Sequence, residues 1–292
     1  EREVVHNERK QVMENNPKGK MYEELQRLAF QRHSYGRPVI VHAEDLDGMS
    51  IKDCEEFYRA YYAPTTAVIC VSGDLKPEKV ARLVDKHYGK IAPQARPTEG
   101  PAKEPEQREE RVSVLSLPVQ VEKAYFGYKV PDARHEDLVP LYVLSSVLSS
   151  GRSSRLYRAL VDTGVCIDQG ASAGGSKDPA LFYCSFTCQT GRKAEEAVDI
   201  LDREIRLVAE KGVSAEELER VKNKISMETH LGLVTNHALC RFIGQHELVY
   251  GDVRAGVEEI AKLMAVEAGD VKRVADRYLR RESRSSVVGK PE

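Results

Sequence analysis

Two acidic residues near the start of the chain, Glu1 and Glu8, have a spacing that could support chemistry. They are seven residues apart, about two turns of an α-helix, so their side chains would lie near one line on its surface. Glu8 also falls midway between Val4 and Val12, on the line that should be the apolar face of this helix. A carboxylate buried there needs a cationic partner, a raised pKa or a metal ion. The alternative is that Glu8 is a surface residue beside Arg9 and that the helix packs by another face.

The elements expected to hold this helix follow it directly. Apolar spacing predicts that the helix itself runs to residue 14, where an Asn-Asn-Pro sequence ends it. Ser50 is placed to cap a later helix. The other predicted elements are helices over 21–32, 51–61 and 77–88 and a buried strand over 67–71.

Residues 92–110 are predicted to be a linker, because four prolines and many charges leave almost nothing apolar to bury. The apolar pattern restarts at residue 111, which predicts a second domain over 111–292. Its expected strands are 112–117, 124–130, 166–173, 181–189 and 286–288, and its main expected helices are 138–148, 193–211, 215–233, 236–250 and 270–279. Strands in series followed by helices in series favour an α+β fold, with a largely antiparallel sheet and helices packed on one face.

An internal repeat relates the two parts of the chain. A helix start at Asp53 recurs at Asp270, an offset of 270 minus 53, or 217 residues. The same offset places Glu8 opposite Ile225, which has the character of a plain core residue. We therefore expect two duplicated domains, the first within residues 1–91, and only the first copy carries an acid at this position.

The two copies differ in length at the front. In the second copy 156 residues, 111 to 266, precede the repeated helix, whereas only 49 precede it in the first copy. Roughly a hundred residues, enough for several strands and a helix, are therefore expected to be absent from the first domain. With one predicted strand left, this truncated domain is too small to form a stable sheet by itself.

Composition argues against several other functions. Lys and Arg number 44 against 46 Asp and Glu, so no overall charge favours nucleic acid or an anionic membrane as partner. No apolar run approaches the roughly 18 residues of a membrane helix. Cys184 and Cys188 point to one face of a predicted strand, which favours small core residues over a redox or metal pair. The histidines include no pair at H-x-x-E-H spacing, so the sequence shows no complete metal site.

Several motifs together resemble the M16 peptidases, a family that includes pitrilysin, insulin-degrading enzyme and the mitochondrial processing peptidase. In chain order they are Glu1-Arg-Glu-Val-Val-x-x-Glu8, Tyr35-Gly36-Arg37-Pro38, Phe57-Tyr58-x-x-Tyr61-Tyr62-x-Pro64 and Gly151-x-Ser153-Ser154-Arg155-Leu156. The resemblance covers nearly the whole chain. It likens the first domain to the latter part of the catalytic domain and the second to the non-catalytic domain of these enzymes.

In such enzymes an H-x-x-E-H helix supplies two zinc-binding histidines and a general-base glutamate, and a later glutamate completes the site. By motif position the resemblance implies that Glu8 is this later zinc ligand and that Glu1 is the acid that supports catalysis. The complete protein would then be a zinc-dependent endopeptidase that hydrolyses peptides with metal-activated water. Because the H-x-x-E-H segment is missing, this chain alone is expected to be inactive and to lack zinc.

One departure from the family pattern bears on partners. Many members carry an Arg and a Tyr seven apart, just after the Ser-Arg-Leu motif, to hold the substrate backbone, and residues 160–167 here have neither. In two-subunit members the zinc subunit often lacks this pair, so the resemblance implies a homologous M16 subunit or a homodimer as partner, besides a peptide substrate. The alternative is a non-catalytic M16-like partner subunit or scaffold protein. The compartment, periplasmic or cytoplasmic, stays open.

Overall fold

A five-stranded sheet forms the centre of the structure, a computed structural model that describes residues 1–95, 100 and 102–292. The strand order is β1-β5-β2-β4-β3, in which β1 and β5 run parallel and all other neighbours antiparallel. The strands are β1 (Arg111–Leu117), β2 (Lys123–Val130), β3 (Cys166–Ala173), β4 (Ala180–Cys188) and β5 (Arg284–Pro291). The predicted α+β class and largely antiparallel sheet are therefore confirmed.

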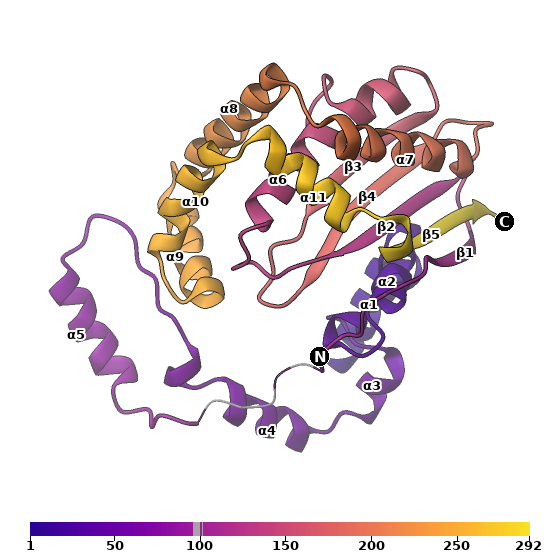
Figure 1. The fold of residues 1–292 in the computed structure, drawn as a ribbon. Coiled ribbons are helices and arrows are strands. Elements are labelled where there is room, and N and C mark those ends of the chain that lie inside the picture. Colours follow the sequence, from indigo (N-terminus) through magenta and orange to yellow (C-terminus); the bar gives the residue numbers. More distant parts are fainter. Residues whose placement is uncertain (96–99, 101) are drawn as a thin grey trace.

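Helices of the predicted second domain cover one face of this sheet. They are α6 (Leu138–Ser149), α7 (Ala194–Lys211), α8 (Ala215–Gly232), α9 (Asn236–Tyr250), α10 (Arg254–Ala265) and α11 (Ala268–Tyr278). Figure 1 shows α6, α7 and α11 over the sheet, with α8, α9 and α10 at one end. Fully buried side chains such as Phe126, Phe182 and Leu144 fill the space between the sheet and the helices. This is the main hydrophobic core, and burial of its apolar surface is the largest contribution to stability.

The opposite face of the sheet is covered by a helix from the predicted first domain. The helices before the linker are α1 (Arg2–Arg9), which continues as a π-helical turn η1 (Lys10–Glu14), then α2 (Pro17–Ala29), α3 (Ala43–Gly48), α4 (Ile51–Tyr61) and α5 (Pro77–Tyr88). Met21 and Leu25 of α2 pack against Leu181 and Val287 in a second apolar cluster. The helices after the predicted linker therefore share one face of the sheet, as predicted, while α2, from before the linker, covers the other face. Both faces are apolar in β4, whose apolar residues face both ways instead of alternating with polar ones.

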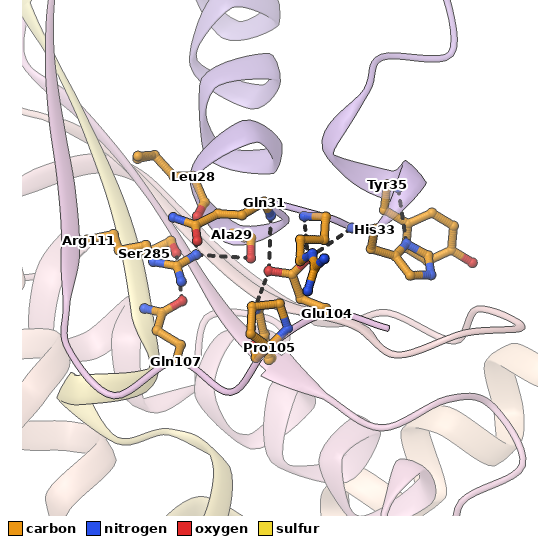
Figure 2. Close-up of polar contacts among 12 residues, drawn as sticks. Leu28, Ala29, Gln31, His33, Tyr35, Glu104, Pro105, Gln107, Arg111 and Ser285 are labelled. Atoms are coloured by element: carbon orange, nitrogen blue, oxygen red, sulfur yellow. Dashed lines mark hydrogen bonds and ion pairs between the residues drawn. The ribbon is translucent and has the colours of Figure 1, made fainter. Parts of the chain in front are cut away.

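Part of the predicted linker is anchored to the sheet and to the end of α2. The carboxylate of Glu104 accepts hydrogen bonds from the backbone N–H groups of Gln31, Arg32 and His33, at 3.0, 2.8 and 2.9 Å. Figure 2 shows Glu104 beside Gln31 and His33. The ammonium of Lys129 on β2 lies 3.1 Å from the same carboxylate. Residues 102–110, called the strap below, are thus a bound segment and not a free spacer. Positions 97 and 101, two of the predicted linker prolines, lie outside the described residues.

The pKa of Glu104 reflects these contacts. Burial alone would raise it, but the hydrogen bonds from the three backbone N–H groups and from Lys129 lower it from 4.5 to about 2. The pKa of Lys129 is itself lowered, because the cost of burying its ammonium outweighs the attraction of Glu104. We therefore attribute most of the stabilisation of the carboxylate to the backbone N–H groups.

The start of α4 confirms the predicted cap and resembles the start of α11. The side chains of Ser50 and Asp53 form a reciprocal capping box, in which Ser50 N–H donates to Asp53 at 2.8 Å. Glu267 and Asp270 form the equivalent box at the start of α11. The two copies of the repeat therefore begin their helices in the same way, as expected from a duplication.

The predicted buried strand over 67–71 is wrong for the described residues. This segment is extended but belongs to no strand there, and Val68, Ile69 and Val71 are between 42 and 51% exposed. Within the described part of the chain, α4 and α5 also make only sparse contacts with other elements. Figure 1 shows both helices lying along one side of the molecule. An extended segment becomes a strand only when another strand satisfies its backbone groups. No other strand of the described residues lies beside this segment.

Candidate functional site

The helix that carries Glu1 and Glu8 packs by a polar face. Arg9 is buried, and its guanidinium donates to the carbonyl of Ile40 at 2.9 Å and to Glu23 at 3.0 Å. His6 Nε2 lies 3.0 Å from Asp47 on α3. His6 and Arg9 are three residues apart and so share one side of the helix. Ion pairs and hydrogen bonds, not an apolar stripe, therefore attach α1 to the residues that follow it.

The line formed by Val4, Glu8 and Val12 points away from these contacts. Val4 is 58% and Val12 43% exposed, and Glu8 is exposed as well. The prediction that this line faces a core is therefore wrong for the described residues, and burial does not force Glu8 to take a metal. Among the described residues, no apolar neighbours cover Val4 and Val12. Arg9 instead binds Glu23 and Ile40 on the other side of the helix.

The carboxylates of Glu1 and Glu8 have no hydrogen-bond or ion-pair partner in the described part of the chain. Glu1 is the residue before the first helical one and forms no side-chain cap, and no ion pair or hydrogen bond involves the carboxylate of either residue. Seven residues separate them by about 10 Å along the helix axis. Immediately after Glu8 the helix widens into the π-turn Lys10–Glu14, a distortion found often at functional sites.

These carboxylates fit part of a zinc site but do not form one. A free, ionised carboxylate is a normal zinc ligand, and a catalytic zinc needs three protein ligands. Within the described residues, no cluster of three or more His, Cys, Asp or Glu side chains is close enough to hold a metal ion. In the part of the chain that the structure describes, Glu8 therefore has an unpaired carboxylate and belongs to no such cluster.

The second-domain counterpart of Glu8 lies in the core, as predicted. Ile225 on α8 is 7% exposed, and it lines a cavity of about 540 Å³ between α6, α8, α9 and α10. The same cavity holds a polar pair missed by the sequence analysis, His246 and Glu259, with Nε2 of the histidine 3.2 Å from the carboxylate. These residues are thirteen apart on different helices, so no spacing rule could have joined them.

The segment expected to lack a substrate-holding pair is placed beside an internal ion pair. Residues 160–167 run from a π-helical turn, Tyr157–Val161, into the start of β3. Just before them, Arg155 of the Ser-Arg-Leu motif donates to Glu217 at 2.7 Å. The arginine of this motif therefore joins the turn to α8 and is not free for a ligand.

Comparison with known proteins assigns the family. Residues 48–225, more than half of the chain, match the family described as the Peptidase M16 inactive domain, so the chain belongs to the M16 peptidase family. It is 29% identical to the "Zinc protease PqqE" of Helicobacter pylori over all of its length and 66% of that protein's. It is 22% identical to the mitochondrial-processing peptidase subunit beta of Mus musculus, over 97% of this chain and 59% of that one. The chain thus spans about two thirds or less of these relatives.

Solved structures agree with this assignment. A protease from Helicobacter pylori superposes on 99% of this chain with a TM-score of 0.94 and 26% identity, and the match covers 71% of that protein. A peptidase M16 inactive domain from Pseudomonas fluorescens gives a TM-score of 0.87 at 13% identity, a likeness of fold alone. In the part of the chain that the structure describes, no helix combines the length and apolar character needed to span a bilayer.

Proposed function

We propose that this chain is part of a zinc-dependent endopeptidase, in which Glu8 is a zinc ligand and Glu1 a supporting acid. The observation that carries the proposal is the position of Glu8. It is an unpaired carboxylate on an exposed line with Val4 and Val12, within a chain related to named zinc proteases. A carboxylate among exposed apolar residues, free of any cation in the described structure, is available to a metal on that side of the helix.

The chain's own residues would hold and orient this ligand. Arg9 fixes the rotation of α1 through Glu23 and Ile40, and this rotation directs Glu8 outward. Glu1 lies two turns earlier on the same line and would act on the same side. When bound, zinc would polarise a peptide carbonyl and lower the pKa of a bound water. The two histidine ligands and the base would have to come from an H-x-x-E-H segment, which this sequence does not contain.

A second candidate is a non-catalytic M16 subunit that works with a homologous partner. The observation that favours it is the match of residues 48–225 to the family described as the Peptidase M16 inactive domain. One relative is by name a subunit of a larger peptidase, which fits this role. A homologous M16 subunit, a second copy of the chain and a peptide substrate are the partners that both proposals allow.

Zinc content and peptide cleavage of the full-length natural protein test the first proposal. Glu8→Gln should lose bound zinc and cleavage together, whereas Glu3→Gln, which alters another exposed acid of the same helix, should keep both. Glu1→Gln should retain zinc but cleave more slowly. Stoichiometric zinc in the Glu8→Gln protein would defeat the assignment of the ligand. A full-length protein with neither zinc nor cleavage would favour the non-catalytic subunit.

A further inference from the structure

Two buried cysteines face each other on adjacent strands of the sheet. Cys166 begins β3, Cys188 ends β4, and the antiparallel ladder pairs them directly. Both are at most 2% exposed, and both belong to the core on the helix-covered face. Directly opposed residues in an antiparallel pair have Cα atoms about 4.5–5.5 Å apart, which lies inside the range that a disulfide accepts.

The two thiols shift each other's pKa in opposite directions. The neighbouring thiol of Cys188 raises the pKa of Cys166, and burial raises it further. The neighbouring thiol of Cys166 lowers the pKa of Cys188 and outweighs the opposing effect of burial. A thiol with a lowered pKa beside a second thiol is the arrangement of a nucleophilic and a resolving cysteine.

We propose that Cys166 and Cys188 form a modification site that a peroxide oxidises to a disulfide. The thiolate of Cys188 attacks one oxygen of the peroxide, the O–O bond breaks, and a sulfenic acid forms on Cys188 with release of hydroxide or alkoxide. The sulfur of Cys166 then attacks the sulfenic sulfur, the S–O bond breaks, and water leaves with the thiol proton. Two thiols have lost two electrons in total, and the peroxide has gained them.

The position of the pair gives a small oxidant a route to it. β3 is the edge strand of the sheet, and Cys166 is its first residue. A register shift follows at once between Cys166 and Asp168, so Ile167 bulges from the ladder and is 55% exposed. Local opening at the start of β3 would give a small oxidant access to the pair without global unfolding. A peroxide is small enough to use such an opening, whereas a bulky disulfide reagent is not.

Cys184 provides a matched control on the same strand. It lies on the same face of β4, is 1% exposed, and pairs across the ladder with Ala171, which has no thiol. Burial raises the pKa of Cys184 to about 12, so its thiol should be inert. Cys184 and Cys188 therefore share strand, face and burial but differ in the residue opposite.

The test is a peptide map of the full-length protein after treatment with hydrogen peroxide and alkylation of free thiols. Trypsin should release residues 159–177 joined to residues 178–192, at about 2 Da below the sum of the two free peptides, and a dithiol reductant should separate them. Because the second peptide holds both Cys184 and Cys188, the map is made on Cys184→Ala, which should form the link at the wild-type rate. Cys166→Ala and Cys188→Ala should each abolish it.

The proposal is overturned if folded Cys184→Ala protein keeps both thiols free while its exposed Cys54 is oxidised. It is equally overturned if the link formed in the wild type runs through Cys184. These readouts need no change at position 166 or 188, so they decide the matter even if substitution there prevents folding. They also need no zinc and no cleavage, so they are independent of the proposed peptidase function.

Discussion

Replacement of Glu104 by glutamine should release the strap and destabilise the fold measurably. Glutamine has nearly the shape of a protonated glutamate, so the pKa difference of Glu104 between unfolded and folded protein estimates the effect. A fall in the pKa of Glu104 from 4.5 to about 2 corresponds to about 3 kcal/mol of stability at neutral pH. The side chain is 10% exposed, so solvent screening removes only part of this, and we expect a loss of about 2 to 3 kcal/mol.

The pH dependence of this stability difference tests the prediction most specifically. The folded-state pKa of Glu104 lies below the unfolded value, so its contribution is complete above pH about 4.5 and is lost as the pH falls towards 2. Urea unfolding of wild type and Glu104→Gln should therefore differ by the full amount at pH 7 and progressively less between pH 5 and pH 2. The matched control is Glu106→Gln, because Glu106 is an exposed residue of the same strap whose ion-pair partner among the described residues is the exposed Arg108. A difference below about 0.5 kcal/mol at pH 7, or one that does not change with pH, would refute the reasoning.

Burial and packing set how much three other perturbations should change stability or amide exchange. Asp137 is fully buried and accepts hydrogen bonds from Arg277 and Tyr278 at 3.1 and 2.6 Å. The side chain of Arg277 is 56% exposed and stays solvated without this partner, so Asp137→Asn should cost about 1.5 to 3 kcal/mol in urea unfolding. A cost below about 0.5 kcal/mol would contradict the assignment of this network. Backbone amides of α4 and α5 should exchange with deuterium orders of magnitude faster than those of β4, and equal protection would show that these helices are packed after all. Glu8→Gln should change the unfolding free energy by less than about 0.5 kcal/mol, since Glu8 is exposed and unpaired; a larger loss would give it a structural role.

Local signals predicted most of the elements well. The strand 166–173 and the helix 236–250 have the predicted bounds. The bounds of the helix could be predicted because Thr235 caps its start and Gly251 ends it. Gly251 has a φ of 73°, in the left-handed conformation that favours glycine. Such signals lie within a few residues of the boundary that they set, so a single sequence displays them.

The orientation of elements depended on distant partners and was harder to predict. Two rows of residues on α1 have helical spacing, one through Val4 and Glu8 and one through His6 and Arg9. The apolar valine favoured the first row as the packed face, whereas the helix packs by the second. The packed face is decided by Glu23 and the carbonyl of Ile40, whose positions the sequence of α1 does not contain.

Contacts that span long stretches of sequence were missed for the same reason. The sequence showed Glu104 only as one charge in a proline-rich run, whereas the backbone N–H groups that bind it lie more than seventy residues earlier. Cys188 was compared with Cys184, its neighbour in sequence, although the strand register pairs it with Cys166. Register and the bulge at Ile167 decide that pairing, and neither can be read from spacing.

The most direct test of the central claim is an anomalous difference map at the zinc absorption edge, from crystals of the full-length natural protein grown with zinc. We predict a peak about 2.0–2.2 Å from a carboxylate oxygen of Glu8, on the side of α1 opposite Arg9. A zinc peak whose ligands exclude Glu8, or no peak beside this helix, would contradict the claim.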